Sequence, residues 1–160
     1  MDAKKIKVAL LQQKRLNLSG NLYYKTQIDF AYNTNYIEGS TITPDETRSI
    51  YETGTILTDN NKVIVVQDVI ETQNHFTLFK YMLETIDDKL TEEMIKHFHF
   101  LLKTGTVSDA DKEIIAIGEY KKLVNYVGNI TTSMPIEVSN DMKKLLDWYQ
   151  KKIIKLLKIL

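Results

Sequence analysis

The segment from Ile28 to Tyr51 constrains the fold most, because it combines a helix end with a helix start only a few residues apart. Gly39 is well placed as the left-handed residue that closes a helix. Shortly after it, Thr43, Pro44 and Glu46 supply a capping box with proline at the first helical position, which indicates the start of another helix. The segment therefore predicts two helices joined by a short extended link.

Glu38 stands in the last turn of the first of these helices, directly before Gly39. A negative side chain at this place opposes the helix macrodipole, which favours cations near the C-terminus. Thr34 lies four residues earlier and so shares a helix face with Glu38. Two interpretations stay open: a carboxylate with a function elsewhere, or an ordinary solvated glutamate beside a helix end.

Composition limits the classes of function. A chain of 160 residues is long enough for one domain with its own core. Basic and acidic residues both number 21, so the net charge gives no reason to expect nucleic acid or a membrane surface as a partner. Cysteine is absent, which excludes disulfides and thiolate metal sites. No signal peptide, membrane-spanning segment or lipidation motif is present, so the expected location is the cytoplasm.

Hydrophobic periodicity predicts a mainly helical chain. The expected helices cover about residues 3–18, 22–38, 44–53, 65–85, 92–104 and 138–160, with a further short helix possible after Ser108. The run of β-branched residues at 63–66 could also form a buried strand, but apolar residues continue at helical spacing as far as Ile86. Gly128-Asn129, between two apolar stretches, predicts a β-hairpin with a two-residue turn.

Residues 38–47, E-G-S-T-I-T-P-D-E-T, resemble a segment of the Fic family, whose members transfer AMP from ATP onto protein hydroxyls. Glu71-x-x-Asn74 is similar to another feature of that family. Residues 118–121, G-E-Y-K, resemble the family's G-x-[FY]-R, with lysine where arginine is usual. The resemblance implies that Thr34, Glu38 and Gly39 form an inhibitory motif. Glu38 would pair with an arginine of the catalytic loop and prevent productive seating of the ATP γ-phosphate.

The same resemblance implies the architecture. It is a mainly α fold, a Fic-like helical bundle with one β-hairpin called the flap, lacking the C-terminal helices of the catalytic loop. Residues 1–58 would form an N-terminal helical arm with the inhibitory helix, and residues 59–160 the front part of the Fic-like core. The flap, at about residues 122–134, would line up the target protein through Lys122, Leu123, Val124, Asn125, Tyr126 and Val127.

The family's catalytic signature, H-x-F-x-[DE]-G-N-[GK]-R, does not occur in these 160 residues. In that signature the histidine is the base, the carboxylate holds Mg²⁺, and the backbone amides and the arginine bind phosphate. None of His75, His97 and His99 precedes an acidic-Gly-Asn run, so no catalytic residue and no metal ligand is assigned. His97 and His99 would project to different sides of a helix, as surface or core-edge residues.

Two functions follow as hypotheses. The first is a protein AMP-transferase regulated by Glu38, with ATP and Mg²⁺ as the cofactors that the family implies. This chain would be truncated before the signature, would not bind them productively and would be inactive as given. The second is a non-catalytic regulatory or target-binding module on the Fic scaffold. In both cases the target protein is unknown.

Two expectations concern burial. Because the sequence lacks the catalytic-loop arginine, we expect Glu38 to be exposed or paired with a lysine or a backbone donor. The last helix carries an apolar stripe, which we expect to be buried against the early helices or against a second copy in a homo-oligomer. The stripe consists of Met142, Leu145, Leu146, Tyr149, Ile153, Leu156, Leu157 and Leu160, widened by Trp148 and Ile154.

Overall fold

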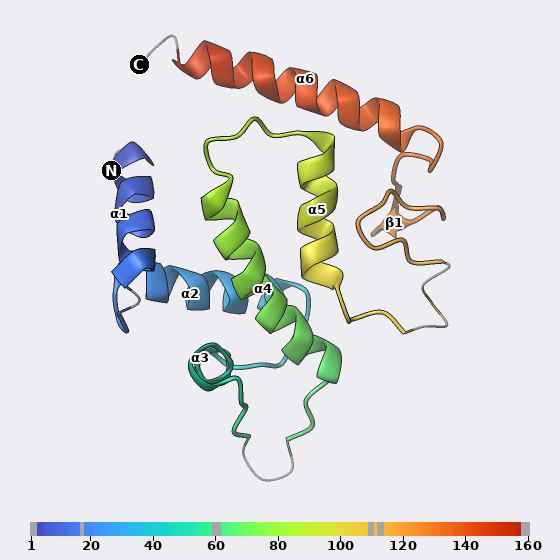
Figure 1. The fold of residues 1–160 in the computed structure, drawn as a ribbon. Helices are drawn as coiled ribbons and strands as arrows, with labels where there is room; N and C mark the ends of the chain where they lie inside the picture. The colour runs from blue at the N-terminus through green and yellow to red at the C-terminus, as the bar shows by residue number, and fades with distance from the viewer. Residues whose placement is uncertain (1–2, 17, 59–61, 109–110, 112–113, 158–160) are drawn as a thin grey trace. The chain divides into compact units, whose positions relative to one another are not determined.

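The computed structural model describes residues 3–16, 18–58, 62–108, 111 and 114–157, with residues 3 and 154–157 described by their backbone alone. These residues form six helices and one two-stranded hairpin, so the predicted mainly helical fold is confirmed. The chain folds into two compact units instead of the single domain expected from its length (Figure 1). The first unit is Met1–Asp88 with Thr104–Thr106, and the second is Lys89–Lys103 with Val107–Leu160.

The first unit is a four-helix arrangement with α2 at its centre. Its helices are α1 (Ala3–Leu16), α2 (Leu22–Ile37), α3 (Pro44–Thr53) and α4 (Val66–Glu84), and α2 packs against the other three. The fully buried apolar side chains that the structure describes all belong to this unit. They are Leu10, Tyr23, Ile28, Ala31, Ile42, Ile50, Leu78, Phe79 and Leu83.

The end of α2 and the start of α3 follow their local sequence signals. Gly39 has a φ of 94°, and its N–H donates to the Tyr36 carbonyl while the Ser40 N–H donates to the Asn35 carbonyl (N···O 3.1 and 3.0 Å). These two bonds are the pair that defines a Schellman motif. At α3 the capping box is complete, because Thr43 Oγ1 accepts from the Glu46 N–H and the Glu46 carboxylate accepts from the Thr43 N–H.

Buried polar contacts link the helices of this unit. Asn35 Nδ2 on α2 donates to Thr72 Oγ1 on α4 over 2.8 Å, and both residues are fully buried. The Glu46 carboxylate is also buried and forms an ion pair with Lys62, which precedes α4. Because buried polar groups are costly unless paired, these contacts favour one arrangement of α2, α3 and α4.

The second unit contains α5 (Glu92–Lys103), the hairpin strands β1 (Tyr126–Val127) and β2 (Ile130–Thr131), and α6 (Val138–Leu157). The strands pair antiparallel, with Val127 opposite Ile130. Gly128 lies in the intervening turn with a φ of 58°, so the predicted two-residue turn is confirmed. Thr91 Oγ1 accepts from the Met94 N–H and caps α5. No side chain of α5 is fully buried, so this unit has a thinner core than the first.

Some expected boundaries were wrong. The first helix ends at Leu16, and Leu18 lies beyond it with 59% of its surface exposed. The paired strands cover 126–131, within the hairpin expected at about 122–134. No helix follows Ser108 at position 111 or between 114 and the start of α6. The expected division at residue 58 into an arm and a core stays a prediction.

The apolar stripe of α6 is only partly covered. Met142 and Leu146 are half-buried, whereas Leu145 and Trp148 are 50% and 55% exposed. Tyr149 and Ile153 are also exposed. Leu160 and the side chains of Ile154, Leu156 and Leu157 lie outside the described residues. Pairing with a second copy through this helix therefore stays a prediction. None of the described helices is both long enough and apolar enough to cross a membrane.

Candidate regulatory site and target-docking hairpin

Glu38 caps the C-terminal end of α2. Its backbone N–H donates to the Thr34 carbonyl (N···O 3.3 Å), which places the two residues of the predicted motif one helical turn apart. The Glu38 side chain is exposed, and Thr34 is half-buried. The expectation that Glu38 would be exposed is confirmed.

The surroundings of Glu38 leave its carboxylate available. No described residue makes a hydrogen bond or ion pair with this carboxylate. Arg48, one of the two arginines of the sequence, binds Asp45 over 2.7 Å. Tyr36 and Ile37, immediately before Glu38, are 64% and 80% exposed. The end of α2 therefore presents one carboxylate beside two exposed apolar side chains.

The predicted docking residues of the hairpin, Lys122 to Val127, are all exposed. Both strands expose their side chains as well as their edges to solvent. The base of the hairpin is closed by Thr132, whose N–H donates to the Asn125 carbonyl over 3.2 Å. Lys121 contributes a further closure by donating to the side chains of Asn125 and Thr132. The hairpin predicted at about residues 122–134 includes Thr132 but leaves out Lys121, which carries no turn or strand signal of its own.

The segment before the hairpin is tied to α5 within the second unit. The Gly118 N–H donates to His99 Nδ1 over 3.1 Å, so this imidazole is an acceptor. Burial, and then the nearby charge of Lys103, lower the pKa of His99 and favour that neutral form. Lys96 lies over the Tyr120 ring, 4.4 Å from its centroid. Burial and the carboxylate of Glu92 raise the pKa of Tyr120 to about 12.

Gly118 tolerates no side chain at its position. Its φ is 74°, and an added Cβ would lie 2.9 Å from Phe100 Cβ. Gly128 has a φ of 58° but open space around it. We therefore expect Gly118→Ala to destabilise the second unit by about 1–2 kcal/mol more than Gly128→Ala, because both variants are disfavoured at positive φ but only the first adds a clash.

Hydrogen exchange of the α5 amides measures this difference, since α5 packs directly against Gly118. Gly128→Ala is the matched control for the backbone cost alone. Equal protection of α5 in the two variants would show that the Gly118–Phe100 contact is not tight.

The expected site residues fall into two groups, each within one unit. Thr34, Glu38 and Gly39 lie together at the end of α2 in the first unit, and Lys122 to Val127 lie in the second. Within the described part of the chain, no three histidine, aspartate or glutamate side chains are grouped as a metal site would require. These described residues thus form no cluster that would hold Mg²⁺ by itself, and ATP and Mg²⁺ stay a prediction from the family resemblance.

No protein-family model matches this chain, and no curated protein matches it. Among solved structures it is similar to a Fic-domain-containing signaling protein from Bacteroides thetaiotaomicron, with a TM-score of 0.66 and 25% sequence identity. The match covers 82% of this chain and 48% of that protein. The fold is Fic-like. The chain thus spans about half the length of a protein whose fold it shares, and the Fic-like helical bundle with one hairpin, predicted from the sequence, is confirmed.

Proposed function

We propose that this chain belongs to the Fic family and supplies the regulatory helix and target-docking hairpin of a protein AMP-transferase. The observation that carries the proposal is the likeness to the Fic-domain protein over 82% of the chain. The ordered series of Fic-like segments at residues 38–47, 71–74 and 118–121 supports it independently.

Glu38 would be the regulatory residue. Its carboxylate is exposed at a helix end and has no partner among the described residues, so it is available to an arginine of a catalytic loop. A carboxylate–arginine pair is a strong, directional contact. When this pair forms, the arginine is withheld from the ATP γ-phosphate, which would keep the transferase inactive.

The 160-residue chain by itself is expected to transfer no AMP. Incubation with labelled ATP, Mg²⁺ and a cell lysate should label no protein, and Glu38→Gly should not change this. The physical reason is that phosphoryl-type transfer depends on positioned charges, and the base, metal ligand and anion nest of the family signature do not occur in the sequence. Labelling that requires only this chain would contradict the expectation.

A chimera tests the proposed role of Glu38 directly. Residues 22–157 would replace the corresponding part of an active Fic AMP-transferase, so that the host supplies the catalytic loop. Glu38→Gln in this chimera should raise AMP incorporation by about tenfold, the factor that corresponds to losing a contact of about 1.4 kcal/mol. Asp29→Asn is the matched control, because Asp29 is also an exposed acid on α2. Equal rates for both variants would exclude a regulatory role for Glu38.

A second function is favoured by the hairpin. Both strands have exposed edges, and an extended peptide could add to either edge by backbone hydrogen bonds. A chain without the catalytic signature would then act as a target-binding module. Two results together would favour this function over AMP transfer. The chain alone would bind a peptide and lose this binding on Val127→Pro, and the chimera would be inactive both with and without Glu38→Gln.

A further inference from the structure

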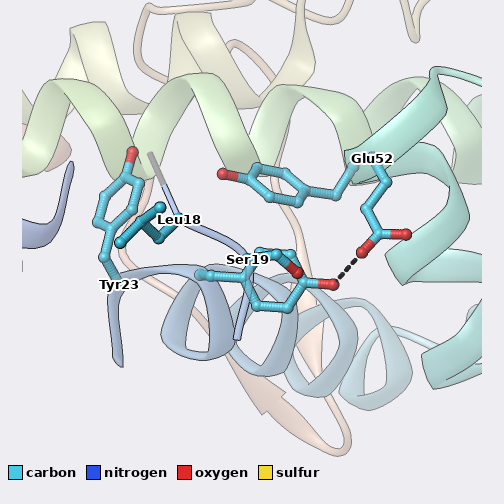
Figure 2. Close-up of a pocket in the computed structure, with 6 residues that line it drawn as sticks. Leu18, Ser19, Tyr23 and Glu52 are labelled. Carbon is cyan, nitrogen blue, oxygen red and sulfur yellow. Dashed lines mark hydrogen bonds between the residues drawn. The ribbon is translucent and has the colours of Figure 1, made fainter. Parts of the chain in front are cut away.

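A pocket of about 430 Å³ lies in the first unit, and its lining does not include Glu38. It is formed by the turn before α2, the first turn of α2 and the last turn of α3 (Figure 2). Its lining residues are Leu18, Ser19, Tyr23, Tyr24, Tyr51 and Glu52. Three of these six side chains are phenol rings and one is a carboxylate, so the walls are aromatic with a single negative charge.

The aromatic walls are held in place by their own contacts. The rings of Tyr24 and Tyr51 meet edge to face, with 5.6 Å between their centroids. Tyr51 Oη accepts a hydrogen bond from Gln27 Nε2 over 2.8 Å, and its ring packs on Phe76 with centroids 4.9 Å apart. Gln27 is fully buried. Because these contacts fix the rings before any ligand arrives, little conformational entropy is lost on binding.

The carboxylate of Glu52 faces the pocket from the side opposite Tyr23 (Figure 2). Its Oε1 accepts from the Tyr24 hydroxyl, while no described residue donates to Oε2. Tyr23 is buried, and this burial, together with Tyr51 and the charge of Glu84, raises its pKa to about 12. Arg48, whose charge acts on Tyr24, is paired with Asp45 over 2.7 Å. The electrostatic surroundings of the pocket therefore favour a positively charged ligand.

We propose that this pocket binds an alkylammonium group, with the phenol rings contacting its methyl or methylene groups and Glu52 balancing its charge. Aromatic rings attract cations through the negative potential of their faces, and quaternary ammonium groups are commonly recognised by such cages. An anionic ligand would be repelled by Glu52, and a neutral apolar ligand would gain no attraction from this carboxylate. The proposal does not depend on AMP transfer and stands or falls separately from it.

Choline and its uncharged isostere 3,3-dimethylbutan-1-ol distinguish charge recognition from simple filling of the pocket. NMR titration of the ¹⁵N-labelled chain should give chemical-shift changes that cluster at residues 18–27 and 48–54. Choline should bind at least about fivefold more tightly than the alcohol, because only choline gains cation–π and ionic attraction. A peptide that contains trimethyllysine tests whether the ammonium group is supplied by a protein side chain instead of a small molecule. Equal affinity for choline and the alcohol, or no shift with either, would overturn the proposal.

Variants test the assigned roles of the wall residues. Glu52→Gln should weaken choline binding by about fivefold and leave the alcohol unaffected, whereas Asp29→Asn, an exposed acid on another part of α2, should change neither. Tyr24→Phe keeps the ring and releases Glu52 from its hydrogen bond, so choline should bind at least as tightly as before. Tyr24→Leu should lose choline binding, and its own melting temperature, compared with that of Tyr24→Phe, shows whether the first unit still folds. Unchanged choline affinity in Glu52→Gln would contradict the role of the carboxylate.

Discussion

Replacing Phe79 with alanine is expected to lower the free energy of unfolding of the first unit by about 3–5 kcal/mol. Phe79 is 7% exposed on α4, and its ring lies 5.9 Å from the ring centroids of both Tyr23 and Phe30. It thus joins α4 to α2 in the centre of the core cluster. The loss combines the transfer free energy of the ring with a cavity that the fixed aromatic neighbours cannot fill.

Urea denaturation followed by far-UV circular dichroism measures this loss. Tyr36→Ala is the control, because it also removes an aromatic ring from the first unit, but one that is 64% exposed. Phe79→Leu should fall between the two. If Phe79→Ala costs no more than Tyr36→Ala, Phe79 does not organise the core as described.

Glu46→Ala is expected to destabilise the first unit by about 2–3 kcal/mol, since it removes both the capping box of α3 and the buried ion pair with Lys62. The loss is smaller than for a fully enclosed pair because the Lys62 side chain is 25% exposed and can reach water. Glu84→Ala is the control, since Glu84 also pairs with a lysine, Lys14, but on the surface. Glu84→Ala should change stability little, as is usual for exposed pairs.

The contribution of Glu46 also depends on pH. Burial by itself would raise the pKa of this carboxyl, but hydrogen bonds from Lys62 and Thr43 outweigh burial and lower it below its ordinary value of 4.5. A lowered folded-state pKa means that the stabilisation is fully present above the unfolded value and is lost as the pH falls through the folded value. The stability difference between the native chain and Glu46→Ala should therefore be largest near neutral pH and shrink below about pH 4. A difference that grows on acidification would contradict this assignment.

The helix ends that the sequence predicted correctly depend on signals between residues close together in the chain. The end of α2 and the start of α3 depend on bonds between residues at most five apart, such as Ser40 to Asn35 and Glu46 to Thr43, so the chemistry is readable in a short window. The first helix ended earlier than predicted because Ser19-Gly20 marks a break without fixing the last helical residue. The Gly128-Asn129 turn located the hairpin, but the extent of its strands could not be predicted, because a turn signal fixes register and not strand length.

The pocket could not be predicted in the same way. Tyr24 and Glu52 are 28 positions apart, and only the packing of α3 on α2 brings them together. Because tyrosine is most often a packing residue, nothing in the sequence singles out Tyr23 and Tyr24 as pocket residues. Tyr23 is buried in the core cluster, but both Tyr23 and Tyr24 also line the pocket.

The Schellman motif at the end of α2 separates the regulatory role proposed for Glu38 from the folding of the helix end. Gly39 and Ser40 satisfy the terminal carbonyls of α2 through backbone bonds, so the helix end makes no use of the Glu38 side chain. A substitution at position 38 can therefore change the charge or length of the side chain without destabilising the helix end. Most substitutions in a folded unit that destabilise it also lower the abundance of the protein. Selection would then change the proposed strength of inhibition through substitutions at position 38 alone, while helix α2 stays the same.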